Sequence, residues 1–148
     1  MHRFAKSLCR ALPFVLPFAL LPGAAHAEET LKIEPGLWET TTSTESPMFP
    51  QPQVRTNESC VTPDQAEFNP QRLVQEAKEC SITDQSRDGN KINWSMICKT
   101  QMGEATATGS AEVNGNRGNG NMVMNMNLGG TPMSLTTTWE SRRVGECG

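Results

Sequence analysis

The sequence predicts a mainly β protein in which an antiparallel meander of about seven strands forms a curled sheet or a lipocalin-like barrel, with one short helical insert. Two observations lead to this fold class. Apolar and polar residues alternate over most of the second half of the chain, which is the period of a strand. Short turns rich in glycine and asparagine separate the alternating segments. A sheet of this length tends to curl or close, because closure removes its exposed edges.

Two strands are expected before the helical insert. Residues 28–34 are a short lead-in, and the run of threonine, tryptophan and polar residues at 36–45 predicts the first strand. The next segment, SPMFPQPQ, contains three prolines and therefore predicts a loop. The segment VRTNESCV then predicts the second strand, with Val54, Thr56 and Cys60 on one face.

The helical insert is expected at about residues 62–78, as two short pieces. Thr62 is followed by a proline and, three residues later, by Gln65, which is the pattern of a capping box. Asn69 is also followed by a proline and repeats the arrangement in front of QRLVQEAKE.

Five strands are expected after the insert. The turn sequences RDGN, NGNRG and GGTP separate alternating segments in this part of the chain. The expected strands lie near residues 80–86, 91–100, 103–113, 119–128 and 132–143. The chain is long enough for one domain and too short for two.

The first 27 residues have the pattern of a secretory signal peptide. Basic residues precede an apolar run, and the segment ends in Ala-His-Ala. The run is short and interrupted by proline, and no second apolar stretch follows, so no membrane span is expected. We expect cleavage after Ala27, export, and a single β-rich domain at residues 28–148.

Charge and composition exclude several function classes. Three of the 13 lysines and arginines lie in the signal, so residues 28–148 have 10 of them against 16 acidic residues, a net charge of -6. Such a chain lacks the basic patch that nucleic acid requires. Both histidines, His2 and His26, lie in the signal, which excludes catalytic triads and histidine zinc sites after cleavage. The acidic residues show no pairing, so no enzyme activity, metal or cofactor is expected.

Four cysteines remain after removal of Cys9 with the signal, and an even number in an exported protein indicates two disulfides. Three pairings are possible. A three-residue loop centred on Gly89 would place Cys80 opposite Cys98, which favours this pair and leaves Cys60 with Cys147. A shift of one residue in the register would move Cys80 away from the position opposite Cys98. A disulfide between Cys60 and Cys80 therefore remains an alternative.

The segment NMVMNMNL raises the question of a soft-metal site. Met122, Met124 and Met126 have the spacing of one strand face, and together they span roughly 13 Å, too far for one copper ion to bind all three. Copper handling would need thioethers from other strands, supplied by Met96, Met102 or Met133. Core packing is the simpler interpretation, and the flexible methionines of this face could leave room for a ligand.

The tripeptide GLW contains the Gly-x-Trp pattern that opens the first strand of lipocalin-type barrels, where a basic residue of the last strand covers the tryptophan. Here Arg142 or Arg143 would supply the cation over Trp38, although plain core packing explains this tryptophan as well. The candidate ligand-binding residues are Trp38, Trp94, Met96, Met122, Met124, Met126 and Trp139.

Several motifs taken together resemble one family, the domain of unknown function numbered 3617. They are PGLWE, CVTPDQ, the later Cys80 and Cys98, NMVMNMNL, and RRVGEC near the end of the chain. The resemblance covers nearly all of residues 28–148. It implies a periplasmic β-rich domain of Gram-negative bacteria with paired cysteines, and it supplies no catalytic residues.

The expected function is non-enzymatic binding, in the periplasm, of a small apolar ligand or of another envelope protein. Copper handling by Met96, Met122, Met124 and Met126 is the first alternative. A structural or inhibitory role toward another secreted protein is the second, and the loop residues Met48 and Phe49 are its best candidates for a contact.

Overall fold

The computed structural model describes residues 29–77, 79–101 and 103–148. The expected signal peptide at 1–27 lies outside these residues. The main element is a seven-stranded antiparallel sheet with strand order β3-β2-β9-β8-β7-β6-β5. Its strands are β2 (Gly36–Glu45), β3 (Gln53–Val61), β5 (Cys80–Asp88), β6 (Lys91–Thr100), β7 (Gly103–Asn114), β8 (Arg117–Leu128) and β9 (Thr131–Gly145).

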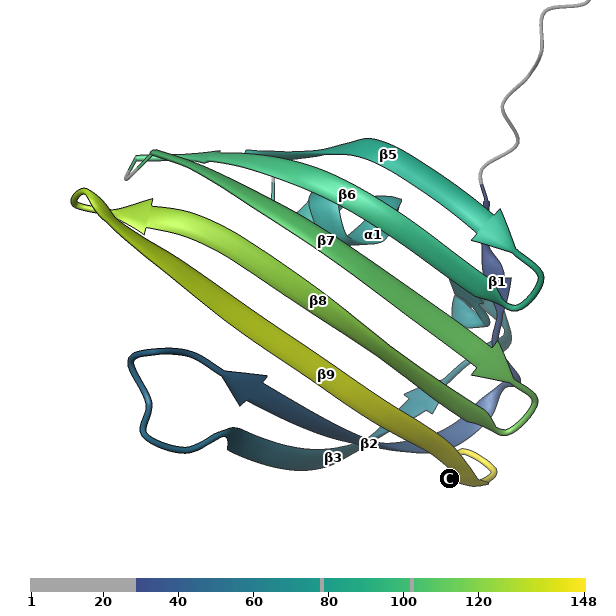
Figure 1. Cartoon of the computed structure of the whole chain (residues 1–148). Helices are drawn as coiled ribbons and strands as arrows, with labels where there is room; N and C mark the ends of the chain where they lie inside the picture. The colour runs from purple at the N-terminus through teal and green to yellow at the C-terminus, as the bar shows by residue number, and fades with distance from the viewer. Residues whose placement is uncertain (1–28, 78, 102) are drawn as a thin grey trace, which may run out of the picture.

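The sheet is a curled sheet and not a closed barrel. Long antiparallel strands run from β5 to β9, and the hairpin of β2 and β3 turns under one side of the sheet (Figure 1). The edge strands β3 and β5 do not pair with each other. Of the two architectures predicted from the sequence, the curled sheet is confirmed.

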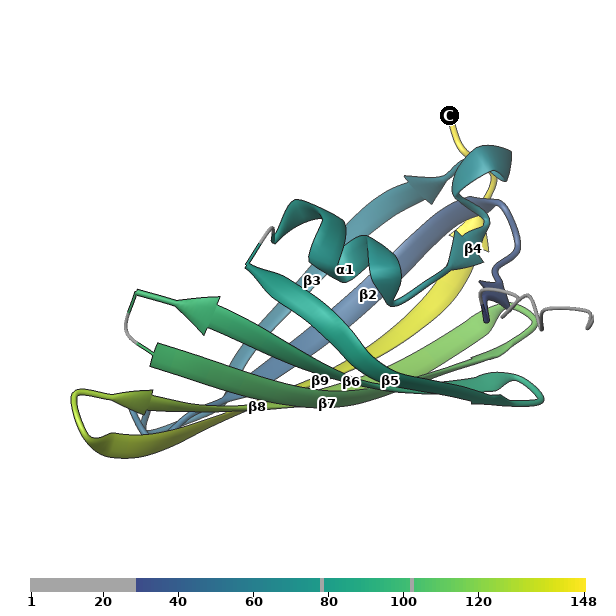
Figure 2. The same cartoon turned by 90° about the horizontal axis from the view of Figure 1, so that it is seen from above.

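A small cover lies on one face of this sheet. It consists of β1 (Leu31–Lys32), a 3-10 helix (Pro63–Gln65), β4 (Glu67–Phe68) and the helix α1 (Gln71–Glu76). Strands β1 and β4 pair with each other, and Figure 2 shows α1 and β4 on the same side of the sheet. The short helical insert is therefore confirmed, with a two-residue strand that the sequence pattern does not reveal.

Local hydrogen bonds explain where the helical pieces begin. The side-chain Oδ1 of Asn69 accepts a hydrogen bond of 2.9 Å from the backbone N–H of Gln71, as a capping residue does. Thr62 precedes the 3-10 helix without a side-chain hydrogen bond to its backbone, so the capping box expected there does not form.

The register between β5 and β6 confirms the predicted pairing of Cys80 with Cys98. The connecting turn contains two residues rather than three, because Asp88 pairs with Lys91. A bulge between Ile82 and Asp84 shifts the register by one residue. The shift of one residue at the bulge offsets the difference of one residue in turn length. Cys80 and Cys98 are therefore opposite each other, as predicted.

The two faces of the sheet differ in polarity. The face under the cover, called the inner face, contains the buried residues of every central strand. The outer face contains mostly threonine, serine, asparagine and charged residues. The core residues are Leu31, Ile92, Trp94, Met96, Cys98, Ala105, Ala107 and Ala111.

Candidate functional site

The inner face has two halves that differ in their burial. The covered half is formed by β5, β6 and β7 under the cover, and Ile92 and Trp94 are there 0% and 2% exposed. The open half is formed by β8, β9, β2 and β3. Trp38 is buried there at 4% exposure, but the other apolar side chains, including Met124 and Leu135, are only half-buried, and the inner-face residues of β3 are largely exposed. The open half is thus a place where the protein leaves apolar surface available.

All seven candidate ligand-binding residues lie on the inner face, but they do not form one site. Trp94 and Met96 are buried in the covered half. Met122, Met124 and Met126 are half-buried beside the core. Trp38 and Trp139 line a cavity that the sequence did not reveal.

Two glycines make room for the tryptophan rings on the inner face. Gly109 is opposite Trp94 in the register, and Gly120 is opposite Trp139. A Cβ atom at either glycine would overlap the neighbouring indole ring. Each indole therefore lies over a neighbouring strand, a known way to cover glycine in a sheet.

An aromatic row connects the covered half to the open half. The ring centroids of Phe68 and Trp94 are 5.6 Å apart, and those of Trp94 and Trp139 are 6.5 Å apart. These distances are within the range of stabilising aromatic pairs. The ring of Trp139 is at the open end of the row, where it borders the cavity.

The cavity has a volume of about 270 Å³ and lies where the cover meets β2, β8 and β9. Gly118 and Ser141 also border it. The volume is slightly below the range of about 300–1,000 Å³ that is usual for small-molecule sites. The apolar side chains that line it are Ile33, Trp38, Val61, Phe68, Ala111, Val113 and Trp139.

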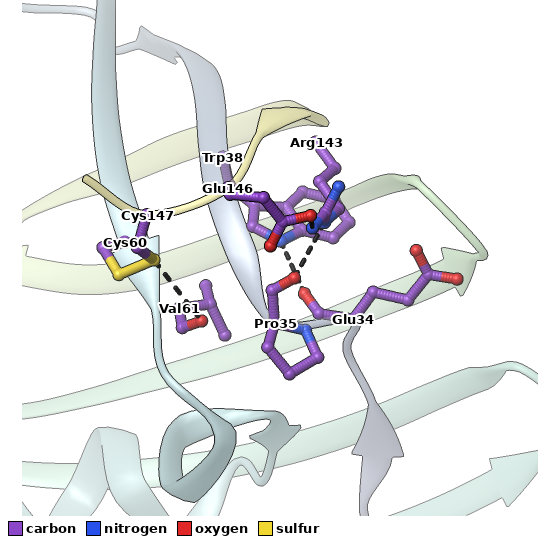
Figure 3. Close-up of polar contacts among 8 residues, drawn as sticks. All are labelled: Glu34, Pro35, Trp38, Cys60, Val61, Arg143, Glu146 and Cys147. Atoms are coloured by element: carbon purple, nitrogen blue, oxygen red, sulfur yellow. Dashed lines mark hydrogen bonds and ion pairs between the residues drawn. A yellow bond between two sulfur atoms is a disulfide. The ribbon is translucent and has the colours of Figure 1, made fainter.

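Polar contacts fix Trp38 at one end of the cavity (Figure 3). Its Nε1 donates a hydrogen bond of 2.8 Å to the backbone oxygen of Glu34. The Nε of Arg143 donates one of 2.7 Å to the backbone oxygen of Pro35. Gly36 has φ of 140°, and a Cβ atom there would overlap the Arg143 side chain, so this position requires glycine.

The same corner is closed by covalent and ionic contacts from the end of the chain. Cys147 forms a disulfide with Cys60, which confirms the predicted second pair. Beside Trp38, the Arg143 guanidinium forms an ion pair with Glu146 (Figure 3). The PGLWE and RRVGEC motifs are therefore neighbours in space, and together they fix Trp38 in one position.

The two adjacent arginines point to opposite faces. Arg143 is opposite Trp38 in the register, so it is the basic residue that the Gly-x-Trp pattern predicts beside the tryptophan. Arg142 lies on the outer face, where its Nε is 2.8 Å from Glu39 Oε1. That hydrogen bond, together with the attraction of the carboxylate, raises the pKa of Arg142.

Charge is segregated between the two faces of the sheet. The register places every acidic residue of the seven strands on the outer face: Glu39, Glu45, Glu58, Asp84, Asp88, Glu104, Glu112 and Glu140. The charged side chains that the seven strands place on the inner face are Arg55, Arg87 and Arg143. A chain that is acidic overall thus has a cationic inner face.

A second depression lies beside the cavity, at the edge of the open half. Its volume is about 410 Å³, and the side chains around it are Thr42, Thr44, Phe49, Gln53 and Arg55. The loop residue Phe49 is 45% exposed and borders it from outside the sheet. The expected loop at SPMFPQPQ therefore reaches the open half of the inner face.

The methionines do not converge on one point. Met126 is opposite Met133 in the register, but β7 separates Met96 from Met124. Two strand spacings are about 9.6 Å. Met102 lies outside the described residues, and across those that are described no three His, Cys, Asp or Glu side chains are grouped to hold a metal ion.

Sequence reasoning missed two parts of this site, Arg55 and the cover residues Ile33 and Phe68. Arg55 has a detectable signal, because the alternation along its strand places it on the face opposite Glu58. The position of Phe68 depends on the pairing of β1 with β4, for which two-residue strands give no pattern. None of the helices in the described ranges has the length and apolar character to span a membrane.

Comparisons with known proteins identify the family. No curated protein and no solved structure matches the chain at a significant level. One family model covers residues 33–147, from the cover to the second cysteine of the Cys60–Cys147 disulfide. The chain therefore belongs to the family described as a protein of unknown function (DUF3617).

Proposed function

We propose that this is an exported, non-enzymatic protein that binds an apolar ligand in the cavity between Trp38, Phe68 and Trp139. The observation that carries the proposal is the cavity itself, which is apolar although it is at the boundary of the open half. Apolar surface exposed in a monomer usually serves binding. The contacts that fix Trp38 keep the cavity preformed, which lowers the entropic cost of binding.

Export to the periplasm is supported by the cysteines and by the start of the sequence. One disulfide, Cys80–Cys98, lies at the core, and the other, Cys60–Cys147, joins β3 to the segment after β9. Disulfides of this kind form and persist in oxidising compartments. Expression in a Gram-negative host should yield a periplasmic product whose first residue is Glu28. A product that keeps residues 1–27 and stays in the cytoplasm would contradict export.

Binding is favoured over catalysis by the residues that are present. Residues 28–148 contain no histidine and no tyrosine, and Glu112, the acidic residue that borders the cavity, is at a register position whose side chain belongs to the outer face. Hydrophobic side chains with few polar groups are typical of small-molecule binding sites. The partner-binding alternative depends on Met48 and Phe49, which are 63% and 45% exposed in the loop.

The test fills the cavity with a larger side chain at Gly118, which borders it. A Cβ atom at Gly118 would meet its neighbours at 3.6 Å or more, and the backbone there does not require glycine. The variant Gly118→Leu should therefore fold and occupy the cavity with its side chain. We expect the affinity for a neutral apolar fluorescent dye to fall about tenfold, which corresponds to about 1.4 kcal/mol.

The matched control is Asn125→Leu, which adds the same side chain to the outer face of β8. It should leave dye affinity unchanged, and circular dichroism should show the same fold for both variants. Equal dye affinity in the folded Gly118→Leu variant and the wild type would overturn binding in this cavity.

A further inference from the structure

We infer that the ligand is a single-chain amphipathic carboxylate whose head group binds Arg55 while its apolar chain enters the cavity. This inference rests on the proposed function and adds the chemical class of the ligand. It follows from three observations: the position of Arg55, the charge of the inner face, and the hydroxyl groups beside it.

Arg55 is next to the cavity on the same face. The register places Arg55 opposite Thr42, and Thr42 opposite Trp139. Thr42 borders the depression at Arg55, and Thr40, the next inner-face residue of β2, borders the cavity. A head group at Arg55 and an apolar chain beside Trp139 are thus two strand spacings apart, about 10 Å.

The charges of the inner face select an anion. Arg143 already pairs with Glu146, and the Nε of Arg87 donates to the backbone oxygen of Gly89. Within the described ranges, the side chain of Arg55 has neither a hydrogen-bond partner nor an ion pair, although its backbone pairs with β2. An unpartnered guanidinium beside an apolar cavity, on a sheet face without carboxylates, would attract an anionic head group.

A carboxylate fits this site better than other head groups. A guanidinium and a carboxylate form two parallel hydrogen bonds, and each carries one charge. The neighbouring hydroxyls of Thr42 and Thr44 can donate further hydrogen bonds to its oxygens. A zwitterionic head group would bring an ammonium group, for which no strand offers an acidic partner on the inner face.

The experiment compares decanoate with decanol, which have the same chain length and differ in the head group. Each is measured by displacement of a neutral dye from the full chain, at pH 8, in low and high salt. We expect the wild type to bind decanoate more tightly than decanol, with an advantage that shrinks as salt rises. Arg55→Gln should weaken decanoate binding about five- to tenfold and leave decanol binding unchanged.

The control is Arg117→Gln, which removes the same charge from the outer-face end of β8 and should leave both affinities unchanged. Equal decanoate binding in wild type and Arg55→Gln would overturn the carboxylate site, while dye binding in the same samples would still support the proposed function. A zwitterionic lysophospholipid that binds as tightly as decanoate and ignores Arg55→Gln would also overturn it. Loss of the dye signal in wild type would refute both.

Discussion

The covered and open halves of the inner face are made from the same kind of strand, yet the buried core cluster lies in only one of them. In the covered half, the alanines Ala105, Ala107 and Ala111 of β7 let the cover approach, and Leu31 is buried to 1% exposure. In the open half, the β8 residues opposite Ala105 and Ala107 are Met126 and Met124, which are half-buried, and the residue opposite Ala111 is Gly120. Small residues thus favour packing against the cover, whereas long flexible ones form a face that can adapt to a bound molecule.

The largest expected effect is loss of the disulfide at the open half. Cys60 and Cys147 are 87 residues apart in sequence and both are exposed, so their bond stabilises the fold by restricting the unfolded chain. The chain-entropy relation gives about 4.6 kcal/mol for a loop of that length. The double variant C60A/C147A should lose roughly that free energy of unfolding in urea titrations.

The single variant C147A provides the control, because breaking the bond requires the loss of only one sulfur. It should lose about as much stability as the double variant. A loss below about 1 kcal/mol in both would show that contacts in the native state, and not the cross-link, stabilise the open half.

The second prediction compares two methionines on one row of the sheet. Met96 and Met124 are both opposite Ala107, but Met96 is 6% exposed under the cover and Met124 is half-buried in the open half. Met96→Ala should cost about 2–5 kcal/mol of unfolding free energy, because it leaves a cavity in the core. Met124→Ala should cost about 1 kcal/mol, since less apolar area is lost.

Thermal and urea unfolding of the two variants measure this difference directly. Equal losses would mean that Met124 is packed as tightly in the open half as Met96 is in the covered half.

The sequence predicted the sheet well because its signals are local and repeated. Alternation and turn residues located β2 at 36–45 and β6 at 91–100, as observed. The pairing of Cys80 with Cys98 was also predictable, since the two lie on strands joined by one turn. Whether the sheet closes into a barrel was not predictable, because the meeting of β3 with β5 depends on the twist and length of all seven strands.

The site was predicted only in part, for a related reason. Trp38 and its basic neighbour follow from a short motif, but the cavity depends on how the cover rests on a sheet far from it in sequence. The pairing of Leu31 with Phe68 joins segments 37 residues apart through two-residue strands, which have no period to detect. The methionine spacing indicated an adaptable strand face without indicating which half of the inner face would stay open.

The smallest expected effect concerns the cover, at the exposed 3-10 helix. A hydrogen bond from the Thr62 hydroxyl lowers the pKa of Asp64 from its usual 3.8. A carboxyl whose pKa is lower in the folded state than in the unfolded state stabilises the fold at pH values above the unfolded-state pKa. That stabilisation is lost as the pH falls through the folded-state pKa. Because Asp64 is fully exposed, the effect on stability should be too small for unfolding titrations to resolve.

NMR titration of the Asp64 carboxyl carbon measures the shift directly. Thr62→Val removes the hydroxyl at nearly constant volume and should raise the pKa of Asp64 toward 3.8, while Thr41→Val, on the outer face of β2, should leave it unchanged. A pKa that stays low in Thr62→Val would assign the shift to the backbone of the 3-10 helix. In either result, the stability of the covered half should stay the same, because its burial comes from Leu31 and Phe68 and not from this exposed turn.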